Sequence, residues 1–198
     1  PGQIPWDVIL IIMSAIAAIC ALQLAGGLDY LVRIAENILR KNPKHINYLA
    51  PTVTYFLTIL AGTGHTAFSM IPVIVEVAKS ENIKPSVPLS IAVVASQIGI
   101  TASPVSAAVV AMSGFLEPFG VSYPTLLGIC ISTTFIAVMI TAFIMSTFTN
   151  NDLSSDPVYQ ERLAAGHVAP PREKNVDFHL KPGAKKSVLI FLIGIICI

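Results

Sequence analysis

Long apolar stretches dominate the chain, and short polar segments separate them. Asp, Glu, Lys and Arg are absent from four of these stretches: residues 8–28, 46–75, 85–116 and 118–151. A helix that spans a membrane needs about 20 mainly apolar residues, so each stretch is long enough to enter or cross a bilayer. The pattern predicts an all-α integral membrane protein.

The first stretch predicts a spanning helix over residues 6–27, with Trp6 at the membrane interface and the pair Gly26 and Gly27 at its end. Residues 28–42 then alternate apolar and charged side chains at helical spacing. Such an amphipathic pattern is typical of a helix that lies along the membrane surface.

The second stretch contains 30 residues, or about 45 Å of helix against a hydrocarbon core of about 30 Å. It is too long for one straight crossing and too short for two. Its middle, Gly62-Thr63-Gly64-His65, favours a turn over a helix. We therefore predict a re-entrant hairpin over residues 46–79, which enters and leaves at the same membrane face.

The third stretch predicts a broken transmembrane helix over residues 86–116. Pro104 lacks an N–H and disfavours helical backbone at Ser103, so one helix should end there and another should begin near Pro104. Residues 123–148 then predict an unbroken spanning helix.

Positive charge orients this arrangement, because short loops rich in Lys and Arg stay cytoplasmic. Such residues precede and follow the hairpin: Arg33, Arg40, Lys41, Lys44, Lys79 and Lys84. After the membrane region, residues 1–148, the sequence predicts a cytoplasmic linker over 149–186 and the truncated start of a further spanning helix over 187–198. We therefore expect the chain to be a piece of a longer protein.

The composition excludes several classes of protein. Hydrophobic residues make up 54% and charged residues 12%, about half the usual charged share. The net charge of +1 argues against nucleic-acid binding. The cysteines, Cys20, Cys130 and Cys197, lie in apolar stretches without a CxxC or a His at ligand spacing. No metal site, disulfide or cofactor is therefore predicted.

The two helix breaks are where we predict binding chemistry. Unwound backbone within a membrane is tolerated only where protein or a water-filled cavity satisfies its polar groups. A helix that restarts after each break offers N–H groups and the positive end of its dipole to an anion, as in secondary transporters. The candidate substrate-binding residues are Gly62, Thr63, Gly64, His65, Thr66, Gln97, Thr101, Ser103, Pro104 and Ser106.

Several of these residues also fit other roles. His65 is compatible with proton relay, with donation to a carboxylate, or with simple packing. Gln97 fits a substrate site or a hydrogen bond between helices. Glu76 is expected to pair with Lys79. Small and hydroxyl residues also permit close helix packing, as in a membrane subunit or sensor that does not transport. An intramembrane enzyme is disfavoured, because His65 has no acidic or basic partner within the apolar stretches.

The sequence closely resembles the Dcu family, the anaerobic C4-dicarboxylate transporters of Gram-negative bacteria. The segments that carry the resemblance are LAGGLDYLVRIAENILRKNPKHINYLAPTVTYFLTILAGTGH, IPVIVEVA, IKPSVPLS and SQIGITASPVSAAVV, in residues 24–110. The linker segment LSSDPVY, residues 153–159, resembles the branch that exchanges aspartate, fumarate and succinate. The resemblance covers essentially the whole chain.

This resemblance implies a multi-pass carrier of the bacterial inner membrane, which exchanges fumarate, succinate, malate or aspartate electroneutrally in anaerobic metabolism. The wider ion-transporter superfamily has two inverted repeats, each with a re-entrant hairpin and a broken helix, and this chain resembles one of them. The implied partners are small dicarboxylate anions and the lipid bilayer, and a homodimer is a compatible assembly. Na⁺ or H⁺ is compatible as a coupling ion.

Overall fold

The computed structural model describes residues 6–149, 151–167 and 182–196. These residues form nine α-helices and three short 3-10 helices. The strand-like pairing within them is a single bridge between Ile83 and Asp152. The all-α prediction is confirmed.

A sharp bend at Gly26 separates the first two helices. The Ile16–Leu24 part of α1 (Trp6–Leu24) is inclined by 72° to α2 (Gly27–Lys41). Gly26 has a φ of +78°, a conformation that glycine adopts without the steric cost other residues meet. The first helix therefore ends a few residues before its predicted end. α2 buries the side chains of Ala35 and Leu39, as expected for an amphipathic helix.

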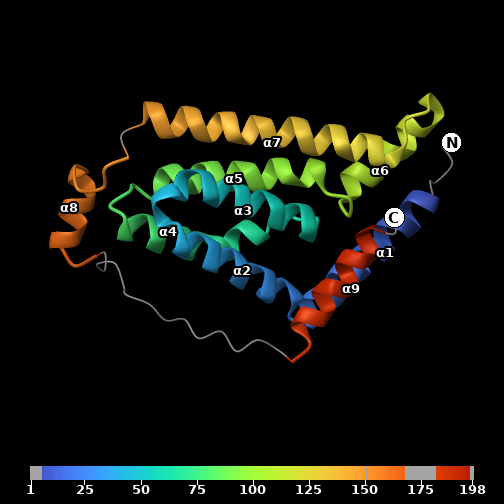
Figure 1. Cartoon of the computed structure of the whole chain (residues 1–198), viewed down its shortest axis with the longest axis horizontal. Coiled ribbons are helices and arrows are strands. Elements are labelled where there is room, and N and C mark those ends of the chain that lie inside the picture. Colours follow the sequence, from blue (N-terminus) through green and yellow to red (C-terminus); the bar gives the residue numbers. More distant parts are fainter. Residues whose placement is uncertain (1–5, 150, 168–181, 197–198) are drawn as a thin grey trace.

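The hairpin segment forms two helices, and the first of them is the centre of the fold. A short turn, η1 (Pro43–His45), leads into α3 (Ile46–Ala61), and α4 (Thr66–Ser80) runs back beside it. The next helix, α5 (Ser86–Gly99), packs along α3. In Figure 1, α2 and α7 lie on opposite sides of this central group.

Three buried apolar clusters hold these helices together, and two of them contain buried residues of α3. The first joins α2, α3 and α4 and includes Leu39, Ile46 and Met70, each with an exposed fraction of 0%. The second joins α3, α5 and α7 around Tyr55 and Val138. α3 contributes to both clusters, so its position is fixed from two sides.

The third and fourth apolar stretches form the longest helical segments. The broken one comprises α5, η2 (Ile100–Ala102), α6 (Ala107–Leu116) and η3 (Glu117–Phe119). The 34 residues of Ser86–Phe119 and the 26 residues of α7 (Tyr123–Phe148) are each long and apolar enough to cross a membrane.

The two hairpin helices are shorter than these segments. α3 has 16 residues and α4 has 15, fewer than the roughly 20 that a full crossing needs. Re-entry of the hairpin from one membrane face stays a prediction.

An ion pair ties the amphipathic helix to the hairpin. A guanidinium nitrogen of Arg40 on α2 lies 3.0 Å from a carboxylate oxygen of Glu76 on α4. The expectation that Glu76 pairs with Lys79 is therefore wrong. The fold brings Arg40, which is 36 positions away in sequence, closer to the Glu76 carboxylate than Lys79 on the same helix.

The polar segment after α7 folds back onto the turn between α4 and α5. The Asn82 amide donates to Asp152 at 2.7 Å, and the Lys84 ammonium lies 3.1 Å from Asp156. Asp156 also caps α8 (Pro157–Ala164), and α9 (Ala184–Ile196) then lies beside α1 and α2. The predicted linker thus contains a short helix. Its residues 150 and 168–181, like the terminal residues 197–198, lie outside the described part.

Acid is expected to release the Lys84–Asp156 contact. The hydrogen bond from Lys84 holds the pKa of Asp156 below its ordinary value of 3.8, and the N–H groups of Tyr159 and Val158 add to this effect. Because the pKa is lowered by folding, the contact is present at neutral pH and is lost as the pH falls through that lowered pKa.

An NMR titration of the Asp156 carboxyl carbon in detergent measures this pKa directly. The expected midpoint lies below 3.8 and moves up in the Lys84→Met variant. A midpoint unchanged by that substitution would show that the ion pair is not formed in solution.

Candidate functional site

The first helix break is a tight turn between α3 and α4. Gly62 has a φ of +67° and donates its N–H to the Thr58 carbonyl at 2.8 Å, which ends α3. α4 begins at Thr66, directly after the predicted turn Gly62-Thr63-Gly64-His65. The Thr66 hydroxyl donates to the Thr63 carbonyl at 3.3 Å, so the turn is closed by its own polar groups.

The second break is an extended residue followed by a turn. Ser103 has extended backbone, as expected before a proline. The Ser106 N–H donates to the Ser103 carbonyl at 3.2 Å, which closes a turn with Pro104 at its second position. α6 begins at Ala107, three residues later than predicted, because the Ser106 hydroxyl caps it by accepting the Val109 N–H at 3.3 Å.

The structure brings the two breaks into direct contact. The Ser103 hydroxyl donates to the carbonyl of Ile59, in the last turn of α3, at 2.6 Å. A Cβ built on Gly62 lies only 2.9 Å from a methyl of Val105. The turn of the hairpin and the break of the long helix therefore pack directly against each other.

A buried cluster of three hydroxyls lies directly beneath the hairpin turn. The Thr58 oxygen is 3.0 Å from the hydroxyl of Thr66 and 2.8 Å from that of Ser96 on α5. The Ser96 hydroxyl also donates to the Gly64 carbonyl at 3.1 Å. Sequence reasoning missed Thr58 and Ser96. Only their positions in the sequence could have indicated them, because Thr58 lies one turn before Gly62 and Ser96 lies next to Gln97.

The candidate residues separate into two groups by exposure. The buried group consists of Gly64, Thr66, Ser103 and Ser106. In each of these residues the backbone carbonyl or the hydroxyl already forms a hydrogen bond within the chain. The exposed group comprises the imidazole of His65, the amide of Gln97 and the hydroxyl of Thr101, which donates to the Ile98 carbonyl at 2.7 Å. Gly62, Thr63 and Pro104 are half-buried.

Two exposed residues, Gln97 and His65, lie at the hairpin turn. The Gln97 amide covers Gly64, since a Cβ built on that glycine lies 2.5 Å from the amide nitrogen. His65 lies beside Phe68, with ring centroids 5.9 Å apart. Gln97 therefore stands over the hairpin turn, and Gly64 allows it that close approach.

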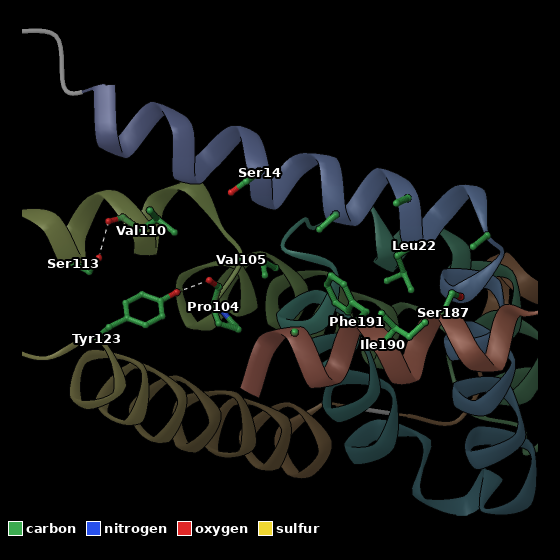
Figure 2. A pocket seen from close by; sticks show the side chains of 14 residues that line it. Ser14, Leu22, Pro104, Val105, Val110, Ser113, Tyr123, Ser187, Ile190 and Phe191 are labelled. Atoms are coloured by element: carbon green, nitrogen blue, oxygen red, sulfur yellow. Dashed lines mark hydrogen bonds between the residues drawn. The ribbon is translucent and has the colours of Figure 1, made fainter. Parts of the chain in front are cut away.

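A separate cavity of about 900 Å³ lies between α1, α6 and α9. Figure 2 shows Tyr123 at one side, with its hydroxyl donating to the Pro104 carbonyl. The walls are mainly apolar, and Pro104 alone of the ten candidate residues lines them. Apolar walls do not compensate the desolvation of an anion, so this cavity is distinct from the predicted anion site.

The described residues contain no group of three or more His, Cys, Asp or Glu that could hold a metal ion. Lys and Arg are also absent from residues 46–75 and 85–116. The polar groups at the two breaks are therefore hydroxyls, amides, an imidazole and backbone dipoles. Such groups suit hydrogen bonding to an anion.

A family model described as anaerobic C4-dicarboxylate membrane transporter matches residues 1–198, the whole chain. The chain belongs to this family. The resemblance found in the sequence is thereby confirmed, and the family is one of membrane transporters rather than enzymes.

Curated relatives carry the same name over the same region. The C4-dicarboxylate transporter DcuA of Wolinella succinogenes is 69% identical over 198 residues, which are 100% of this chain and 45% of that protein. The transporters of that name are 65% identical in Helicobacter pylori J99, where the match covers 100% of this chain and 44% of the relative. The C4-dicarboxylate transporter DcuA of Escherichia coli K12 is 54% identical, and the match covers 99% of this chain and 45% of that protein. The chain spans less than half the length of these relatives. No solved structure matches it.

Proposed function

We propose that this chain supplies half of the substrate pathway of a C4-dicarboxylate carrier in the bacterial inner membrane. The proposed substrates are fumarate, succinate, malate and aspartate, exchanged electroneutrally in anaerobic metabolism. One observation supports the proposal beyond family membership: two helix breaks, separated in sequence by the helices α4 and α5, meet where Ser103 contacts Ile59. Secondary transporters place their substrates at such junctions.

The chemistry of the junction suits a dicarboxylate. A dianion that leaves water loses a large hydration energy, which hydrogen-bond donors and helix N-termini must replace. The N-terminus of α4 begins at Thr66, and the exposed Gln97 and Thr101 side chains lie along the adjoining helix end. To compensate the lost hydration energy of the dianion fully, the site also requires a cation from the rest of the carrier or a co-bound Na⁺ or H⁺.

We assign the two exposure groups different roles. His65, Gln97 and Thr101 contact the substrate, and the buried hydroxyls of Thr66, Ser103 and Ser106 hold the backbone of the breaks in place. The hydrogen bonds of the buried group support this division, because each connects a hydroxyl to the main chain at or beside a break. Gly62, Thr63, Gly64 and Pro104 shape the surface.

Exchange in liposomes tests the proposed function. The full-length protein is reconstituted in vesicles preloaded with succinate, and entry of labelled fumarate or aspartate is followed. We expect entry that depends on internal dicarboxylate and is competed by malate but not by citrate or chloride. Absence of entry with a folded preparation would refute the carrier function and favour a structural or sensor role.

Loss of an exposed polar group at the junction is expected to weaken substrate binding. Thr101→Ala should raise KM about tenfold, the effect of losing a hydrogen bond of about 1.5 kcal/mol to a charged ligand. This is the low end for a charged partner, because the Thr101 hydroxyl must leave the Ile98 carbonyl to donate to the substrate. Thr141→Ala on α7 is the matched control, because both threonines are exposed and both hydroxyls bond a carbonyl of the preceding turn, at 2.7 and 2.8 Å. Equal KM values in the two variants would remove Thr101 from the site.

A further inference from the structure

The hydroxyl cluster beneath the hairpin turn connects three helices at one point. Thr58 belongs to α3, Thr66 to α4 and Ser96 to α5. Their exposed fractions are 0%, 2% and 0%, so their hydroxyls are shielded from water. Buried hydroxyls bound to one another fix a single arrangement of the groups around them.

The cluster ends on the backbone of the turn rather than within a helix. Ser96 donates to the Gly64 carbonyl at 3.1 Å, and Thr66 donates to the Thr63 carbonyl at 3.3 Å. Thr58 touches both donors and thereby links the two carbonyls. The orientation of the peptide groups at the turn therefore depends on a hydroxyl chain that starts from the helices below.

We propose that Thr58 and Ser96 are positioning residues, which set the affinity for dicarboxylate by holding the Gly64 backbone beneath Gln97. This inference rests on the proposed function of the junction. Neither side chain reaches the surface, so neither contacts the substrate itself. They act through the turn, since displacement of Gly64 moves the peptide groups that begin α4 and the neighbouring Gln97 amide.

Thr54 offers a matched control on the same pair of helices. It lies one turn before Thr58 on α3, its exposed fraction is 0%, and its hydroxyl donates to the Ala92 carbonyl of α5 at 2.9 Å. Thr54→Val and Thr58→Val each replace a hydroxyl by a methyl group, and both positions are fully buried. The second substitution alone affects the chain of hydroxyls that leads to the turn.

The experiment measures KM and the maximal exchange rate of the full-length carrier in liposomes, normalised to folded protein. We expect Thr58→Val and Ser96→Ala to raise KM about tenfold, as loss of one buried hydrogen bond to the turn would. The maximal rate should stay within about twofold, Thr54→Val should keep the wild-type KM, and Thr58→Ser should restore it.

The outcomes separate this inference from the proposed function. If wild-type protein exchanges dicarboxylate and Thr58→Val changes KM no more than Thr54→Val, the positioning role is wrong while the carrier function stands. If wild-type protein does not exchange, the proposed function fails. Should Thr58→Val not fold, Ser96→Ala removes a single oxygen and decides the matter, because an unchanged KM there overturns the inference.

Discussion

Replacement of Gly62 by valine is expected to abolish dicarboxylate exchange. The residue has a φ of +67°, where an L-residue pays about 1–2 kcal/mol. A Cβ at this position also lies 2.9 Å from a methyl of Val105 and 3.3 Å from its carbonyl oxygen. The added side chain must push the hairpin turn away from the second break, which separates the two halves of the junction.

The Gly120→Val variant separates backbone strain from this contact. Gly120 has a similar φ of +75°, but nothing lies within 4 Å of a Cβ built there. Both variants should lose a few degrees of thermal stability, at about 2–4 °C per kcal/mol for a chain of this size. Exchange should persist in Gly120→Val and disappear in Gly62→Val. Comparable exchange rates in the two variants would contradict contact between the breaks.

Replacement of Gly99 by leucine is expected to cause the largest loss of stability. Gly99 ends α5 against α3, and its added Cβ lies 3.1 Å from the Tyr55 carbonyl oxygen and 3.2 Å from the Thr58 Cβ. Because a backbone atom is in the way, the two helices must move apart. Overpacking of this kind costs about 1–3 kcal/mol, or roughly 2–12 °C in the unfolding midpoint.

Thermal unfolding in detergent, followed by circular dichroism, measures this loss. Gly128→Leu on α7 is the control, since a Cβ built on Gly128 meets nothing within 4 Å and leucine favours a helix more than glycine does. Its midpoint should be unchanged or slightly higher. A midpoint of Gly99→Leu equal to that of the control would show that α3 and α5 are not packed closely at this position.

The local features of the fold are predictable from sequence because local chemistry determines them. Gly62 supplies a left-handed residue at the end of a helix, and Pro104 forces extended backbone on Ser103. Both effects act between neighbours, so helix ends at these two places follow from the residues alone. The start of α6 did not, because a serine cap at Ser106 competed with the proline rule.

Contacts between distant segments were not predictable in this way. Arg40 reaches Glu76 across 36 positions, and Ser96 reaches Thr58 across 38. A lone Thr or Ser in an apolar stretch fits packing as well as bonding, and only the register of α3 against α5 brings these two oxygens together. The two helix breaks were therefore located from the sequence, and the binding site at them stays a prediction, while the division of its residues into exposed and buried groups required the structure.

The number of hydroxyl protons limits how many hydrogen bonds the cluster of Thr58, Thr66 and Ser96 can form at once. Thr58, Thr66 and Ser96 have one hydroxyl proton each, yet their oxygens make four close approaches, two to one another and two to carbonyls of the turn. At any instant three of these approaches hold a proton and one does not. Each O–H bond can therefore rotate from one acceptor to another while the carbon and oxygen atoms stay in place. The hairpin turn is therefore held in place by three hydrogen bonds at a time, shared among four close oxygen contacts.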